Sequence, residues 1–389
     1  MTISYAAAIS GPVARSLKAL VLAAGLSLVP SAYAASANTN PAYQCHRVAV
    51  LAPDSTPISG IEDLAVDQRR QRLILSAYDR FAVQDALRHG EDPPQGNLYV
   101  TDIASLVKGT PDEIEARVLV TRGMEDVILH PHGIGLYDDG EIQRLAVVNR
   151  LADRHDHSAA DLLLLEFMGD GLVLAGRARG DAYCRANDVT LIGPDTAIFT
   201  FDQTRCGAWG VWLERIVQPR RSGLRLTRFG QDGQVETKTL VSDAAFANGV
   251  AQDKSTGTLL MTASRDGEIR HYPLEDLLSG ETDFAAVEVD GGPDNISVTG
   301  QGNVSLTAHP VPFDLFLYMN GLGELPGSRV LLRRAGQDDF IMIDPDAEEL
   351  PGAATSAVFL GERVVVSSAW DAGLGLCVPD GPQADGDRK

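Results

Sequence analysis

The feature that most constrains the fold of this chain is a long series of short apolar or alternating runs separated by glycine-containing turns. Runs such as RLILSAY, NLYVTDI, RLAVVN and RVVVSSA have the length and the β-branched content of strands. Turns such as DDGE at 138–141, QDGQ at 231–234 and RDGE at 265–268 contain the glycine that tight hairpins need for positive φ. Helical periodicity is confined to residues 79–90 and 274–280. The pattern therefore predicts an all-β protein.

So many short strands need a way to protect their edges. A β-propeller does this by repeating four-stranded sheets around a central axis, and the runs suffice for about six such blades. No low-complexity linker divides the interior, which favours a single domain over residues 44–378. The repeat within each blade is weak, so a pair of sandwiches or another barrel stays open at this point.

The N-terminus has the pattern of a secretory signal peptide. Arg15 and Lys18 precede the apolar run 19–29, and the motif AYA at 32–34 fits the cleavage pattern of such peptides. The apolar run is shorter than the roughly 20 residues that a membrane span needs. We therefore expect residues 1–34 to be removed and the protein to be exported, either to a bacterial periplasm or out of the cell.

The remaining chain has polar ends and a strongly acidic balance. By composition, residues 35–43 form a loose segment and residues 379–389 a disordered tail. Removing residues 1–34, which carry two positive charges and no negative ones, takes the net charge from −20 to −22. Such a chain repels nucleic acid, and nothing in the sequence indicates a transmembrane segment. The expected partner is a small molecule.

Four cysteines remain in the exported part, which is an even number in an oxidising compartment. Four cysteines allow three pairings. We favour a bond between Cys45 and Cys377, because they lie close to the two ends of the mature chain. Cys184 and Cys206 are expected either to pair with each other or to stay reduced and buried.

Short polar signatures beside β-type runs are the strongest indication of function. They contain, in chain order, Glu62-Asp63, His132, Asn187-Asp188, Asn248 and Asp294-Asn295. A fold that brings many loops to one centre would gather these side chains. Oxygen ligands converging on one point suit a hard cation, and calcium is the first candidate.

In these motifs, the chain resembles the paraoxonase/arylesterase family, which is related to the gluconolactonase-type six-bladed propellers. The resemblance rests on GIEDLAVD, HPHGI, ANDVTLIGPD, FANGV, DNISV, AHP and the final AATSAVFLGERVVVSSA…GLC, which occur in this order between Cys45 and Cys377. Each motif alone is weak, but the ordered set is specific. It implies a six-bladed β-propeller that is closed by the Cys45–Cys377 disulfide.

The resemblance further implies two calcium ions in the central tunnel. The catalytic calcium would be bound by Glu62, Asn187, Asn248, Asp294 and Asn295. The structural calcium would be bound by Asp63, Asp188 and the backbone carbonyl of Ile134. Neighbouring residues of an extended chain point to opposite sides, so in each polar pair one member faces one ion and the next member the other.

The expected activity is hydrolysis of lactones or carboxylic esters. Calcium would polarise the carbonyl group, His132 or a calcium-bound water would supply the nucleophile, and Asn187 and Asn248 would hold the ion. His309 matches a histidine of the substrate-pocket wall. Phe246 and Phe316 match pocket aromatics of the family, although ordinary core packing explains them equally well.

One departure from the family pattern bears on activity. The second histidine of a proposed proton relay follows the run VVN in the family, whereas Arg150 stands there in this chain. Arginine does not act as a base at ordinary pH, although it can hold a carboxylate. His155 and His157 lie just downstream and are more simply read as a solvated hairpin tip.

Two other functions stay open at this stage. The first is a calcium-stabilised propeller that binds a small ligand or a protein and catalyses no reaction, which the loss of the relay histidine favours. The second is a related propeller enzyme of the sugar-lactonase type. The paired polar motifs favour the two-calcium type over relatives with one metal.

Overall fold

The computed structural model describes residues 42–380, with gaps at 152–158, 208–209, 211–213, 215–216, 218–219, 231 and 345–348. The expected signal peptide, residues 35–41 of the loose segment and residues 381–389 of the tail lie outside this part, and so do His155 and His157. The first strand starts at Tyr43 and the last ends at Pro379. These bounds differ by one residue at each end from the expected domain, 44–378.

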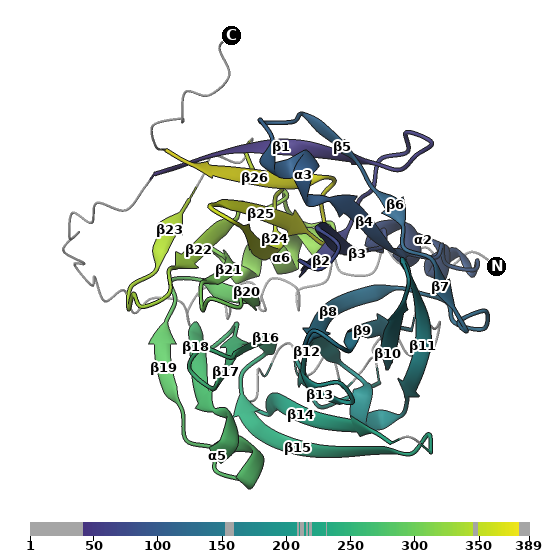
Figure 1. Ribbon diagram of the computed structural model, residues 1–389, viewed down its shortest axis with the longest axis vertical. Coiled ribbons are helices and arrows are strands. Elements are labelled where there is room, and N and C mark those ends of the chain that lie inside the picture. The colour runs from purple at the N-terminus through teal and green to yellow at the C-terminus, as the bar shows by residue number, and fades with distance from the viewer. Residues whose placement is uncertain are drawn as a thin grey trace, which may run out of the picture. The chain divides into compact units, whose positions relative to one another are not determined.

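Six sheets are arranged around a central axis as the blades of a β-propeller (Figure 1). Five blades follow the chain order from the inner strand outward. The first has β2 (Ile61–Asp67), β3 (Arg72–Ala77), β4 (Asn97–Asp102) and β6 (Arg117–Val118). The second has β8 (Pro131–Asp138), β9 (Gln143–Arg150), β10 (Ala160–Met168) and β11 (Gly171–Ala178). The third has β12 (Ala186–Gly193), β13 (Thr196–Phe201), β14 (Ser222–Phe229) and β15 (Val235–Ala244).

The fourth and fifth blades repeat this arrangement. The fourth has β16 (Ala247–Asp253), β17 (Thr258–Ala263), β18 (Glu268–Pro273) and β19 (Ala285–Glu288). The fifth has β20 (Gly292–Val298), β21 (Val304–His309), β22 (Arg329–Arg333) and β23 (Ile341–Ile343). Two short strands lie parallel to outer strands: β5 (Glu113–Glu115) beside β1, and β7 (Thr121–Arg122) beside β11. The expected six-bladed architecture is confirmed.

The sixth blade joins the two ends of the chain. Its strands β24 (Ala354–Leu360), β25 (Arg363–Ser368) and β26 (Leu374–Pro379) are completed by β1 (Tyr43–Leu51), which pairs antiparallel with β26 (Figure 1). Cys45 lies directly opposite Cys377 in this ladder and forms a disulfide with it, as expected. Cys184 and Cys206 are also joined in a disulfide, which resolves the alternative that the sequence left open.

The apolar core lies between neighbouring blades. The described residues form six buried clusters, and each cluster combines side chains of two adjacent blades. Because neighbouring blades cover both faces of each sheet, its inner and second strands are largely buried on both faces, whereas outer strands such as β15 are largely exposed. The second strand β3, for example, is buried over its whole length. This explains why the strands appear in the sequence as continuous apolar runs rather than as strict alternation.

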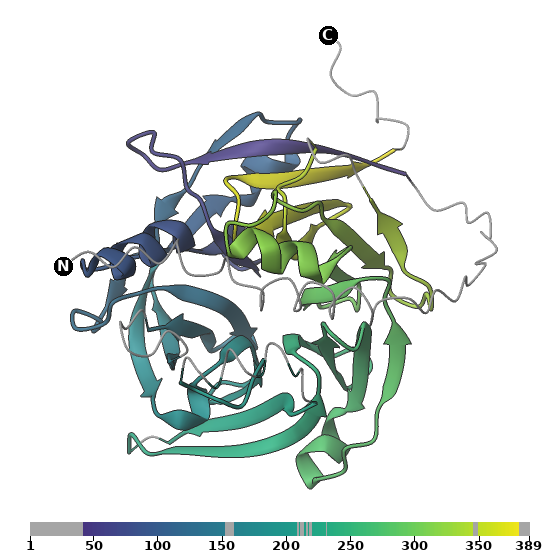
Figure 2. The same ribbon diagram turned by 180° about the vertical axis from the view of Figure 1, so that it is seen from behind.

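Four α-helices are found among the described residues, and two of them were expected. The α2 helix (Arg80–His89) is capped by the Asp79 side chain and ends at Gly90 in the left-handed conformation, and α5 is Leu274–Ser279. The short α3 (Ile103–Val107) and α6 (Pro312–Met319) were not predicted. A short 3-10 helix, η1 (Asp181–Tyr183), precedes β12. Figure 2, from the opposite side, brings α2 and α6 to the front. No helix among the described residues is long and apolar enough to span a membrane.

Candidate active site

In each of the six blades, the pairing between the inner strand and the second strand is interrupted near the N-terminal end of the inner strand. The register shifts by one residue in every blade, as at a β-bulge. We call the first residue after the last regular pair the upper position. In chain order the upper positions are Glu62, His132, Asn187, Asn248, Asp294 and Thr355. All six line one cavity of about 600 Å³. We call these six residues the upper ring.

The residue after each upper position belongs to a second ring, which we call the lower ring. Its members are Asp63, Gly133, Asp188, Gly249, Asn295 and Ser356. The two glycines are required by close backbone approach. A Cβ at Gly133 would lie 2.5 Å from the Asp188 Cα, and one at Gly249 would lie 2.8 Å from the Asn295 Cα. The upper residues line the cavity and the lower ones do not, so neighbouring residues alternate between two levels, as extended backbone predicts.

The backbone turns sharply just before most inner strands. Gly60, Arg185, Phe246, Gly291 and Ala353 each precede an inner strand and have positive φ. At Gly60 the left-handed conformation is unstrained, and a Cβ there would lie 2.1 Å from the Tyr78 carbonyl oxygen. Arg185, Phe246 and Ala353 hold the same conformation at the cost of strain, which is a feature of functional sites.

Hydroxyl groups of the second strands connect neighbouring bulges. In the third blade, the Asp188 N–H donates to Thr200 Oγ1 (2.9 Å), and this hydroxyl donates to the Asn248 carbonyl of the next blade. Ser76 links the Asp63 N–H (3.1 Å) to the His132 carbonyl (2.6 Å) in the same way. Thr262 repeats the link between the fourth and fifth blades. These bonds fix the spacing of the rings.

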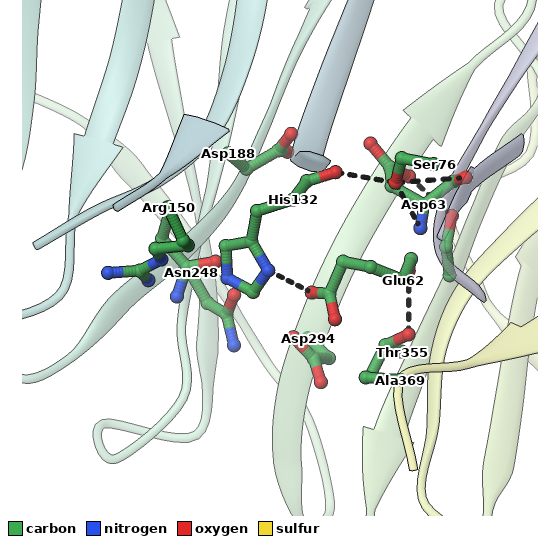
Figure 3. A network of polar contacts seen from close by, with 12 residues as sticks. Glu62, Asp63, Ser76, His132, Arg150, Asp188, Asn248, Asp294, Thr355 and Ala369 are labelled. Carbon is green, nitrogen blue, oxygen red and sulfur yellow. Dashed lines mark hydrogen bonds and ion pairs between the residues drawn. The ribbon is translucent and has the colours of Figure 1, made fainter. Parts of the chain in front are cut away.

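Four carboxylates are buried in the two rings: Glu62, Asp63, Asp188 and Asp294 (Figure 3). Burial raises the pKa of Glu62 to about 7, against the opposing charge of Arg80. Burial also raises the pKa of Asp63 to about 6, although three hydrogen bonds lower it. For Asp188, burial and then repulsion by Asp63 raise the pKa well above its usual range. A cation on the axis would reverse these shifts, because it stabilises the ionised forms.

Arg80 contacts both Glu62 and His132. The Arg80 Nη2 atom is 2.6 Å from Glu62 Oε2 and 2.9 Å from His132 Nδ1. Since a guanidinium only donates, Nδ1 accepts and Nε2 carries the ring hydrogen. Burial lowers the pKa of His132 well below its usual value, and the positive charges of Arg150 and Arg80 lower it further. The ring is therefore neutral in this arrangement, and its lone pair is occupied.

The other two histidines of the cavity have different surroundings. His309 Nε2 is 2.8 Å from Asp294 Oδ2, and its Nδ1 is buried without a partner. It therefore contacts a residue that was expected to bind calcium, and it also lines the cavity as part of the wall. His130 is held by two backbone carbonyls, those of Pro94 (2.9 Å) and Arg150 (3.2 Å), which gives it a structural role.

The cavity wall combines an apolar and a cationic part. Two helices contribute Val83 and Leu87 of α2 and Leu315 and Met319 of α6, and the expected aromatics Phe246 and Phe316 line it as well. Arg80, Arg150, Arg185 and Asp202 also line the cavity. Sequence reasoning did not single out Arg80, Arg185, Asp202 or Thr355. Only Thr355 had a visible signal, because ATS precedes a β-type run just as AND and PDN do.

The sequence profile of the arylesterase family matches residues 90–339. The chain belongs to the arylesterase family. This membership supports a hydrolase of the esterase or lactonase type, and hence a small-molecule substrate. No curated protein sequence matches the chain.

Solved structures resemble this arylesterase-family chain over most of its length. A calcium-binding protein, regucalcin, from Agrobacterium tumefaciens is 13% identical, with a TM-score of 0.47 and coverage of 85% of this chain and 95% of that chain. A gluconolactonase from Xanthomonas campestris is 15% identical, with a TM-score of 0.47 and coverage of 83% and 88%. The assignment to the family rests on the sequence profile.

The donor set of the two rings fits the calcium ions that the resemblance implies. Asn248 Oδ1 and both side-chain polar atoms of Asn295 are buried without a hydrogen-bond partner. The Asn248 and Asn187 amide nitrogens donate to Ser264 (3.2 Å) and Asp202 (3.4 Å), which leaves their oxygens available as ligands. Within the described residues, no group of three His, Cys, Asp or Glu side chains is positioned to hold a metal. Each expected calcium set has only two carboxylates; side-chain amides complete the catalytic set, and the Ile134 carbonyl was expected to complete the structural one.

Two of the expected calcium ligands, Asn295 and Ile134, are associated with the lower ring. Asn295 belongs to the lower ring, with Asp63 and Asp188, rather than to the upper ring. The contact of Ile134 with the lower ring is through its N–H, which donates to Asp63 Oδ2 (2.8 Å). Asp188 Oδ2 accepts a similar bond from the Val250 N–H (2.7 Å). The lower carboxylates are thus held by backbone groups of adjacent blades.

Proposed function

We propose that the protein is an exported, calcium-dependent hydrolase of lactones and carboxylic esters. The upper ring carries this proposal, because it places carboxylates, amides and a histidine at the floor of a cavity with an apolar wall. The cavity volume of about 600 Å³ is suited to a small organic substrate. The two disulfides agree with export to an oxidising compartment.

Glu62, Asn187, Asn248 and Asp294 would hold the catalytic ion, with Asn295 reaching it from the lower ring. Asp63, Asp188 and Ile134 would hold the structural one. When bound, calcium supplies a Lewis acid for the carbonyl oxygen of the substrate. Asn187 and Asn248 keep their oxygens directed at the axis, because their amide nitrogens are engaged on the wall.

We assign to His132 the transfer of the proton from the attacking water. Its Nδ1 atom becomes free for this proton when Arg80 keeps only its contact with Glu62, which is the shorter of the two. The bond from Ser76 Oγ to the His132 carbonyl keeps the backbone in place while the ring changes partner. Apolar side chains of α2 and α6 limit the access of other water molecules.

Hydrolysis assays test this function. The panel is an aliphatic γ- or δ-lactone, an acyl-homoserine lactone and phenyl acetate, each with calcium and after treatment with EGTA. We expect turnover that EGTA abolishes and that calcium restores. Asp294→Asn should lower kcat/KM by at least about 100-fold while the protein still folds, and the exposed Asp126→Asn should change nothing. Undiminished turnover in EGTA would contradict the proposal.

A second candidate is a propeller that binds a ligand without catalysis. Two observations favour it: Arg80 occupies the lone pair of His132, and Arg150 replaces the relay histidine. In that case calcium raises the melting temperature, but no substrate of the panel is hydrolysed.

A further inference from the structure

Two arginines on the cavity wall share one carboxylate. Arg185 binds Asp202 in a bidentate manner, with Nε at 2.7 Å from Oδ1 and Nη2 at 2.6 Å from Oδ2. Arg150 reaches the same carboxylate only at 3.6 Å, from Nη2 to Oδ2. The Arg150 Nη1 atom is buried and has no hydrogen-bond partner. These three residues, which we call the Arg150 cluster, therefore have one positive charge in excess.

The excess charge is unusual for a buried group. A guanidinium loses its hydration on burial, and this cost is normally offset by a paired anion. Arg265 also lines the cavity, and its Nη1 atom donates to the backbone carbonyl of Glu214 (3.5 Å) rather than to a carboxylate among the described residues. The wall is thus cationic in a chain whose net charge is −20. The charge of this wall is set locally and is opposite in sign to the charge of the protein.

The Arg150 cluster adjoins the upper ring. The Asn187 side chain donates to Asp202 (3.4 Å), and Arg150 lies beside His132 (Figure 3). The backbone of Arg150 is fixed by a bond from its N–H to the His130 carbonyl (3.0 Å). A ligand group bound by the free Nη1 atom would therefore lie beside the reacting carbonyl.

We propose that the Arg150 cluster is a subsite for a carboxylate carried by the substrate, so that the enzyme acts on lactones or esters with a carboxylate close to the reacting bond. The single charge of a carboxylate matches the single charge in excess, and the guanidinium fork matches its geometry. The apolar side chains of α6 then cover the remainder of the substrate. This inference rests on the proposed function only in taking the upper ring as the reacting centre.

The test compares γ-butyrolactone-5-carboxylate with the corresponding 5-carboxamide, which lacks the charge. In the wild type we expect a higher kcat/KM for the carboxylate. Arg150→Gln should lower the ratio of the two kcat/KM values by about 10- to 100-fold, which is typical of the loss of a hydrogen bond to a charged group. Arg150→Lys keeps the charge but not the planar guanidinium, so its ratio of kcat/KM values should lie between those of the wild type and Arg150→Gln. The control is Arg228→Gln, which removes the same charge from an exposed position on β14 outside the cavity. An unchanged ratio in Arg150→Gln overturns the proposal.

Binding provides a readout that does not depend on hydrolysis. Calorimetric titration of the calcium-loaded protein with cyclopentanecarboxylate should show binding that Arg150→Gln weakens about 10-fold or more. This result supports the subsite even if none of the lactones is hydrolysed, so it separates the subsite from the proposed function. Binding that is unchanged in Arg150→Gln but lost in EGTA would place the carboxylate on the metal and overturn the proposal.

Discussion

Removing the Cys45–Cys377 disulfide should cost more stability than removing Cys184–Cys206, whereas removing Cys184–Cys206 should cost more activity. Cys45–Cys377 spans 332 residues, whereas Cys184–Cys206 spans 22. In the chain-entropy treatment the loops contribute about 6 and about 3.5 kcal/mol to the free energy of unfolding. Replacing the first pair by alanine should therefore destabilise the protein by about 2.5 kcal/mol more than replacing the second. Alanine is chosen because Cys377 is fully buried and a serine would bury an unpaired hydroxyl.

Activity should follow the reverse order. Cys184 precedes Arg185, which holds a left-handed conformation (φ 63°) and begins the turn that places Asn187 in the upper ring. Without the bond to Cys206, this strained residue can relax, and Asn187 moves with it. We expect kcat/KM to fall about 10-fold or more in the variant that lacks Cys184–Cys206. The variant without Cys45–Cys377 should keep its activity within about twofold wherever it is folded, since the ladder between β1 and β26 remains.

Urea unfolding in saturating calcium, followed by tryptophan fluorescence, measures the stability of both variants. Hydrolysis is measured at a temperature at which circular dichroism shows both to be folded. The reasoning fails if the variant without the short loop is the less stable one. It also fails if that variant has full activity while the other has lost it.

Three further predictions concern the rings and the turns that form them. Without calcium, the raised pKa values of Glu62 and Asp63 mean that the folded state binds more protons than the unfolded state, so the melting temperature in EGTA should fall as the pH rises from about 5 to 8. With calcium this fall should disappear. Differential scanning fluorimetry measures the melting temperature under both conditions, and a melting temperature in EGTA that does not change with pH would contradict the raised pKa values. Gly60→Ala should cost more than about 3 kcal/mol or prevent folding, whereas Gly109→Ala, with the same sign of φ and an open surrounding, should cost about 1 kcal/mol in urea unfolding. Thr200→Val should cost about 1–3 kcal/mol and reduce calcium affinity measured by calorimetry, and unchanged affinity would show that the bridge does not support the site.

The sequence predicted the floor of the cavity better than its wall. Glu62, Asn187 and Asp294 were identifiable because each lies at the start of an inner strand, directly before a β-type run. Equivalent places in the sequence are therefore equivalent places around the axis. Arg80 was not identifiable, because its contacts with Glu62 and His132 depend on how α2 packs over the first blade. Arg185 and Asp202 lie 17 residues apart and meet at the open end of the β12–β13 hairpin, where Arg185 precedes the first strand and Asp202 follows the second. Such pairings depend on tertiary packing, which no local pattern encodes.

The helix α6 was missed for a related reason. Apart from Asp314, its sequence, PFDLFLYM, consists of apolar and aromatic residues, so it has no clear helical periodicity to detect. Phe313 and Phe316 remain exposed instead of entering the core, and Phe316 also lines the cavity. The pairing of Cys184 with Cys206 was left open because spacing alone does not decide between a bond and two thiols.

The six bulges have a consequence for how such an enzyme can change its chemistry. Each one presents a single side chain to the axis, while the ladder on either side and the turn before it are fixed by other residues. A carboxylate, an imidazole, two amides, a second carboxylate and a hydroxyl now occupy equivalent backbone positions. Exchanging one for another alters the reacting centre without altering the strands. Point substitutions at six places can therefore change the set of catalytic groups while the scaffold stays the same. At Thr355, a new group would stand between the carboxylates of Glu62 and Asp294, its neighbours in the upper ring.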